Sequence, residues 1–122
     1  MSQLPHIAAA SLSLLWLIVH LVLGGRQIAR PLRQAPDLTP VVRDTQYLCW
    51  HFTSVAIGAM AILFALAVIL ETPAYAVSAT LLAAGFAIVG IGIVVAIRGS
   101  HAVLPQGWLF VPVAALGLWG LM

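Results

Sequence analysis

Residues 44–58 read DTQYLCWHFTSVAIG, and within this stretch the chain changes from a polar segment to a long apolar one. Asp44 lies on the polar side of the change, and no further charged residue follows before Glu71. A helix needs an apolar run of about 20 residues, at about 1.5 Å per residue, to cross the hydrocarbon core of a bilayer. The stretch therefore predicts a helix that begins in the headgroup region of a membrane and continues across it.

The rest of the chain has the same apolar character. Of its 122 residues, 63% are hydrophobic and only 7% are charged, whereas a soluble domain carries about 25% charged residues. Three carboxylates and five arginines are too few to cover the surface of a water-soluble globule of this length. We therefore predict an all-α membrane protein whose main surroundings are the lipid bilayer.

The chain divides into four apolar segments. As candidate membrane spans, these segments lie at about 4–25, 46–70, 74–97 and 103–122. Pro31 is expected to end the first helix, because a proline inside a helix removes a hydrogen bond and collides with the preceding turn. Thr39-Pro40 is typical of a helix start, with threonine at the N-cap and proline at the first helical position. The prediction is a single domain over residues 1–122, a four-transmembrane-helix bundle.

Small residues are concentrated in the third span. Ala79, Ala83 and Ala87 follow one another at four-residue spacing. Such rows let helix backbones approach closely, and in lipid it is this packing that holds helices together. A chain with only four short spans and such a row is expected to form a homo-oligomer or to assemble with partner membrane subunits.

The arginines predict the orientation of the bundle. All five fall in the segments 26–44 and 98–102, which lie on one side of the membrane if there are four spans, with both termini on the other side. Because positively charged loops are retained in the cytoplasm, we expect an N-out, C-out, multi-pass protein of the cell inner membrane with its arginine-rich loops cytoplasmic. The arginines are not interleaved with aromatic residues, so no nucleic acid is expected as a partner.

Two histidines are expected at the same depth. His20 lies four residues before the Gly24-Gly25 end of the first span, and His51 lies a similar distance inside the second span, which runs the other way. Each belongs to a stripe of polar and small residues at three- and four-residue spacing. The stripes are Ser13, Trp16, His20, Gly24 and Gln27, and Asp44, Tyr47, His51, Ser54 and Gly58. Because polar groups inside a membrane usually face a bundle interior, the two stripes are expected to face each other.

These facing stripes define a candidate binding site. Its polar side chains come from the first two spans and from the segment after the third. The predicted ligand contacts are His20, His51 and Tyr47, with Arg26, Trp50 and His101 around the rim. A simpler interpretation is that the aromatic and histidine side chains are anchors at the membrane interface and that the arginines only determine topology.

Three ligand chemistries are compatible with this site. A b-type haem needs two imidazoles from facing helices, which His20 and His51 would supply. A transition metal on the same two residues needs a third ligand, from His101 or Asp44. A quinone or another small amphiphile needs only a hydrogen-bonding side chain such as Tyr47 beside an apolar slot.

The leading functional hypothesis is a membrane protein that binds a small ligand, cofactor or metal between its first two helices. One alternative is a structural or accessory subunit of a larger membrane complex. Another is a membrane enzyme that acts on a quinone or a lipid. No serine, histidine and acid are spaced for nucleophilic catalysis, and no cation is obliged to sit beside the single Cys49. An enzyme is therefore the minority interpretation.

Overall fold

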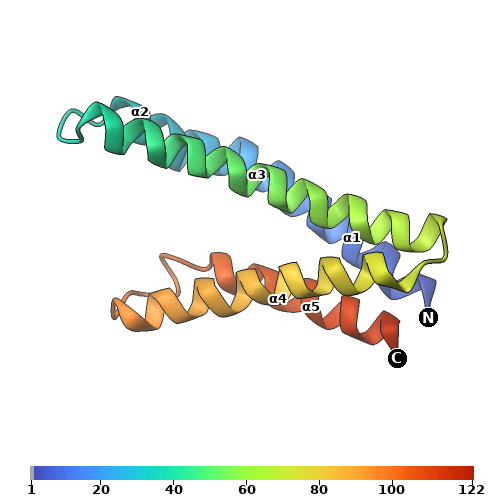
Figure 1. Ribbon diagram of the computed structural model, residues 1–122. Coiled ribbons are helices and arrows are strands. Elements are labelled where there is room, and N and C mark those ends of the chain that lie inside the picture. Colours follow the sequence, from blue (N-terminus) through green and yellow to red (C-terminus); the bar gives the residue numbers. More distant parts are fainter. Residues whose placement is uncertain (1) are drawn as a thin grey trace.

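The computed structural model describes residues 2–122, and all regular secondary structure within them is helical (Figure 1). The helices are α1 (Gln3–Val19), the π-helix η1 (His20–Ala29), α2 (Arg30–Gln34), α3 (Pro40–Ile69), α4 (Pro73–Ala96) and α5 (Gln106–Leu121). Three stretches are long and apolar enough to cross a membrane, namely Gln3–Gln34, Pro40–Ile69 and Pro73–Ala96, and α5 is a shorter apolar helix. This architecture is consistent with the predicted helical membrane bundle.

The helices form an up-and-down bundle of two pairs. The continuous rod of α1, η1 and α2 packs along α3, and α4 packs along α5. Contacts between α1 and α5 and between α3 and α4 join the pairs, which meet at the end that holds both chain termini and diverge toward the end that holds α2 (Figure 1). The Ser2 backbone N–H donates to the Gly120 carbonyl at 2.8 Å, and the Trp16 indole N–H donates to the Leu109 carbonyl at 2.8 Å. These two bonds tie the first helix to the last.

The interior of the bundle is small and the outer surface is apolar. Met60, Phe64 and Val113 are fully buried, and Ala79, Ala83 and Ala87 lie beside them in the core. The alanine row seen in the sequence therefore does face the bundle. Large hydrophobic side chains are exposed on every long helix and on α5, which is the distribution that a lipid-facing surface requires.

The helices of the α4–α5 pair touch through their backbones. A Cβ atom built on Gly90 would lie 2.6 Å from the Cα of Gly107. Only two glycines facing each other permit this approach, because any other residue would insert a carbon between the two chains. Close backbone contact of this kind is a general means of holding helices together in lipid.

Helix α3 begins at Pro40, as Thr39-Pro40 predicts, although the Thr39 side chain makes no capping hydrogen bond. The predicted end of the first helix at Pro31 is wrong, because the rod continues to Gln34. The reason lies in η1, whose hydrogen bonds run from residue i+5 to residue i, as in the bond from the Arg30 N–H to the Gly25 carbonyl. These wider turns leave space for the ring of Pro31 where a regular helix would place a carbonyl. Much of the segment predicted as a loop, 26–44, is therefore helical.

The last helix is shorter than the apolar run that predicts it. Helix α5 begins at Gln106, with Pro105 at its N-cap, and its 16 residues extend about 24 Å. It continues through Pro112 without a break. The turns at the two ends of α4 contain Glu71 and Arg98 in the left-handed backbone region, with φ of 50° and 54°.

Candidate functional site

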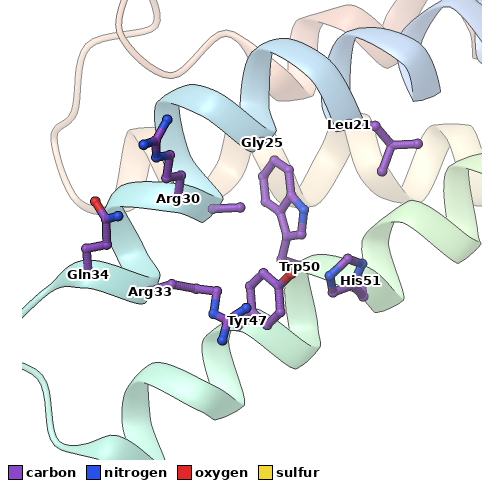
Figure 2. A pocket seen from close by; sticks show the side chains of 9 residues that line it. Leu21, Gly25, Arg30, Arg33, Gln34, Tyr47, Trp50 and His51 are labelled. Carbon is purple, nitrogen blue, oxygen red and sulfur yellow. The ribbon is translucent and has the colours of Figure 1, made fainter.

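An open pocket of about 520 Å³ lies between the η1–α2 part of the rod and the first half of α3 (Figure 2). Its lining combines two arginines, a glutamine, a tyrosine, a tryptophan and a histidine with one leucine and two small residues. The lining residues are Leu21, Gly25, Ala29, Arg30, Arg33, Gln34, Tyr47, Trp50 and His51. The pocket is therefore polar toward α2 and apolar toward α1.

Three ring and guanidinium groups interact along one side of the pocket. Arg33 reaches from α2 across to α3, where its guanidinium carbon lies 4.7 Å from the centroid of the Tyr47 ring (Figure 2). The Tyr47 ring meets the His51 ring edge to face, with centroids 4.6 Å apart. A cation over an aromatic face is attracted by the ring's negative quadrupole, so this contact both joins α2 to α3 and orients the guanidinium.

His20 does not line the pocket but contacts Trp50, which does. Its imidazole stacks on the Trp50 indole with centroids 3.8 Å apart, and Nε2 lies 3.0 Å from the Ser54 Oγ and 3.3 Å from the Trp50 carbonyl oxygen. Because a carbonyl only accepts hydrogen bonds, Nε2 carries the hydrogen and donates it. Four residues after His20 on η1, Gly24 makes room for the indole, since a Cβ there would collide with the ring.

His20 contacts Trp50, the residue before His51, so the parts of η1 and α3 that carry the two predicted histidines are neighbours. Their roles in the structure differ. His20 points at α3 and is half-buried, whereas His51 is exposed and lines the pocket with Tyr47 and Trp50. The structure therefore brings Tyr47, Trp50 and His51 together in one pocket and places His20 outside its lining.

Two of the predicted rim residues lie elsewhere. Arg26 is exposed and does not line the pocket. His101 lies in the turn between α4 and α5, where its Nδ1 accepts a hydrogen bond from the Trp108 indole at 3.1 Å. Neither residue is part of the pocket lining that contains Tyr47.

Sequence reasoning missed Arg30, Arg33 and Gln34 because it assigned them to a loop. Leu21 and Arg30 are nine residues apart, which is about two and a half turns of an α-helix, so regular helical spacing places them on opposite faces. The wider turns of η1 bring both to the pocket. A π-helix has no residue signature of its own, and the sequence therefore offers no signal for this arrangement.

The charged side chains of the pocket have one sign. Within residues 2–122 the ion pair between Arg43 and Asp44, at 3.4 Å, is the one that forms. Arg30 and Arg33 therefore have no carboxylate within 4 Å in that part of the chain, and no acidic residue lines the pocket. The pocket has the electrostatics of an anion site.

No predicted third metal ligand is grouped with His20 and His51 in the described part of the chain. Over residues 2–122 no three histidine, cysteine or acidic side chains are grouped so that they could hold a metal ion, so neither His101 nor Asp44 supplies the third ligand. For haem, the Nε2 of His20 is engaged with Ser54 and with the Trp50 carbonyl oxygen of α3, so in this arrangement that nitrogen is not free to bind an iron.

A fourth histidine is buried far from this pocket. His6 is fully buried, and its Nε2 lies 3.2 Å from the Gly117 carbonyl oxygen of α5, to which it donates. Its Nδ1 has no hydrogen-bond partner among the residues described. Gly120 faces the ring so closely that a Cβ there would lie 2.5 Å from Nε2. His6 does not belong to the site predicted from the sequence.

Comparisons of the chain with protein families, with curated proteins and with solved structures give no match. No known relative therefore indicates a ligand or a reaction. The functional interpretation depends on the chemistry of the pocket between η1–α2 and α3.

Proposed function

We propose that this protein is an integral membrane protein that binds a small amphiphilic ligand in the pocket between η1–α2 and α3. The observation that carries the proposal is the division of the pocket wall into an apolar part and a polar part. Leu21, Gly25 and Ala29 form the first, and arginine, glutamine, tyrosine and histidine side chains form the second. Ligand sites commonly combine an apolar wall with a few polar groups that fix orientation.

The position of the pocket along the chain supports an amphiphile. Leu21 belongs to the apolar run that ends at Gly25, and the arginines begin at Arg26. A pocket that extends from Leu21 to Gln34 therefore crosses the expected boundary between hydrocarbon and headgroups. A ligand with an apolar tail and a polar head satisfies both parts, and a lipid or a quinone has this form.

Trp50 provides a reporter for the test. The protein is reconstituted in phosphatidylcholine nanodiscs that contain increasing fractions of one of three quenching probes. These are phosphatidic acid and diacylglycerol, both brominated in their acyl chains, and a short-chain benzoquinone. We expect at least one probe to give saturable quenching that disappears in Trp50→Phe, in which the other three tryptophans remain. If no probe gives quenching that saturates and depends on Trp50, the proposed function is wrong.

We further propose that the arginine-bearing end faces the cytoplasm, with both termini outside, because all five arginines lie at that end. The test uses single cysteines in a Cys49→Ala background. We expect a membrane-impermeant thiol reagent to label Ala74→Cys on intact cells and to label Asp37→Cys only after the cells are opened. The opposite pattern would reverse the orientation.

A second candidate function, a subunit of a larger assembly, is favoured by the outer face of α4. Gly85 and Gly92 are exposed there, and a Cβ on either would have no neighbour within 4 Å. Small exposed residues permit another helix to approach closely in lipid, and the occupant we propose is a second copy of the chain.

Crosslinking in native membranes tests this candidate. The expected wild-type product is a dimer that is lost in the double variant Gly85→Ile/Gly92→Ile and kept in Ala115→Ile, which enlarges an exposed small residue of α5. A wild-type protein that yields only monomer, or a dimer that survives the double change, would exclude this interface.

A further inference from the structure

The positive charge of the pocket is not paired with a carboxylate in residues 2–122. Arg30 and Arg33 have no carboxylate partner in residues 2–122, and Asp44 is already paired with Arg43 on the exposed face of α3. Two uncompensated cations at the edge of a low-dielectric region attract an anion more strongly than they would in water. The pocket therefore favours a negatively charged ligand head over a neutral one.

Arg33 is also held in a suitable orientation. Its guanidinium lies over the Tyr47 ring at 4.7 Å, and that ring is in turn held edge to face by His51 at 4.6 Å. Stacking uses the flat face of a guanidinium and leaves its edge N–H groups available to donate hydrogen bonds. These edge donors match the geometry of phosphate oxygens, which guanidinium groups bind through two parallel bonds.

The wide turns of η1 bring Arg30 into the same pocket as the apolar residues Leu21 and Gly25. Arg30 donates its backbone N–H to Gly25, five residues earlier, and both residues line the pocket with Leu21. Leu21 is 46% exposed, so the apolar wall opens onto the lipid-facing surface. A ligand whose head meets the arginines can therefore extend its tail into the bilayer.

On the basis of the proposed function, we infer that the ligand head is a phosphate group and that Arg30 and Arg33 bind it. Tyr47 and His51 lie on the opposite wall, where their polar groups can contact the remaining phosphate oxygens or the group that carries them. A phosphate of this kind is found on the head of an anionic phospholipid and on a water-soluble phosphate ester. The two sources share the chemistry that the pocket recognises.

The test compares two charge-matched variants with the same probes. Arg30→Gln/Arg33→Gln removes both pocket cations, and Arg26→Gln/Arg43→Gln removes the same charge from arginines outside the pocket. We expect the first variant to weaken Trp50 quenching by brominated phosphatidic acid about ten-fold or more, because charge-assisted bonds to phosphate are lost. The second variant should bind within about two-fold of wild type, and diacylglycerol with the same brominated tails should bind wild type more weakly than phosphatidic acid.

Two further measurements keep the result interpretable. Circular dichroism of each variant shows whether the helices are intact. The single variant Arg30→Gln removes one pocket cation and leaves the contact between Arg33 and Tyr47 in place. Raising the salt concentration should weaken phosphatidic acid binding and leave quinone binding unchanged, because salt screens the interaction between charges. Unchanged phosphatidic acid binding in high salt would count against the inference.

A competition experiment identifies the source of the phosphate. If glycerol 3-phosphate in the aqueous phase displaces brominated phosphatidic acid, a water-soluble phosphate ester is a ligand. If it does not, and binding still requires Arg30 and Arg33, the ligand is a phospholipid head. Equal binding of phosphatidic acid and diacylglycerol, or equal loss in both charge-matched variants, would overturn the phosphate inference. The proposed function would survive that result, because it fails only when no probe gives Trp50-dependent quenching.

Discussion

Gly24 of η1 lies directly against the Trp50 indole of α3, at a position where any side chain would collide with the ring. The indole also stacks on the His20 ring, with 3.8 Å between the ring centroids. The position of the Trp50 indole is thus fixed by the space that Gly24 leaves and by stacking on the His20 ring. Since Trp50 also lines the pocket, the packing of the two helices and the shape of the candidate site depend on the same side chain.

Gly24→Ala should therefore destabilise the protein. The added methyl group must displace the indole, and overpacking of this kind costs about 1–3 kcal/mol. The measurement is thermal unfolding in detergent followed by circular dichroism, together with the tryptophan emission maximum. Gly25→Ala is the matched control for stability, because a Cβ at that neighbouring position has no atom within 4 Å. Equal destabilisation by the two changes would show that Gly24 is needed for its backbone and not for the space it leaves.

The hydrogen bond between His20 and Ser54 should contribute little to stability. Ser54→Ala removes one acceptor of the Nε2 hydrogen, but the Trp50 carbonyl oxygen remains at 3.3 Å. Bonds between side chains of membrane helices average about 0.6 kcal/mol, so the loss should be of that order. His20→Phe keeps a flat ring against Trp50 and removes the same bond.

The double variant Ser54→Ala/His20→Phe shows whether the two residues interact. Because both changes remove one shared interaction, Ser54→Ala/His20→Phe should cost less than the sum of the single changes. Chemical unfolding in mixed micelles measures the three differences. Additive losses would mean that His20 and Ser54 stabilise the protein independently, and the contact at 3.0 Å would have no energetic role.

The sequence predicts the parts of this structure that depend on helix length and hydrophobic pattern. The all-helical bundle follows from the apolar runs, and the start of α3 follows from the backbone preferences of Thr39 and Pro40. The burial of Ala83 and its neighbours follows from their spacing. Each of these predictions uses information that lies within a single helix.

The remaining features depend on information that no single segment contains. The pocket positions of Arg30 and Arg33 require the wide turns of η1 and a helix that continues past Pro31, where local rules predict a stop. The burial of His6 requires the space that Gly120 leaves and the carbonyl oxygen of Gly117, both more than a hundred residues away in the chain. Tyr47 and His51 were predicted for the site, because their spacing on one regular helix is local.

The contact between Gly90 and Gly107 predicts a difference between two glycines of the same helix. Gly90→Ala should destabilise the α4–α5 pair by about 1–3 kcal/mol, because its Cβ would lie 2.6 Å from a backbone atom that cannot rotate away. Gly92→Ala, on the exposed side of α4, has no atom within 4 Å of the new Cβ. It should leave the stability of the single bundle unchanged or raise it by up to about 1 kcal/mol, the difference in helix propensity. Thermal unfolding measures the difference in stability between the two variants. Equal stability of Gly90→Ala and Gly92→Ala would mean that the close contact between α4 and α5 is easily given up.

The buried His6 allows packing to be separated from hydrogen bonding. His6→Leu keeps most of the volume and loses the bond from Nε2 to the Gly117 carbonyl oxygen, which in a membrane bundle is worth about 0.6 kcal/mol. That carbonyl belongs to helix α5 and retains its helical bond, and the unpartnered Nδ1 is removed together with the ring. His6→Leu should therefore cost no more than about 1 kcal/mol.

His6→Ala should be much more damaging, because it leaves an unfilled space between α1, α3 and α5. The ring contacts Gly120 and lies 6.0 Å from Phe64 between centroids, and replacing a large buried side chain by alanine costs about 2–5 kcal/mol. Unfolding of both variants in the same detergent gives the two differences directly. If His6→Leu were as destabilising as His6→Ala, the polar edge of the imidazole and not its volume would hold the first and last helices together.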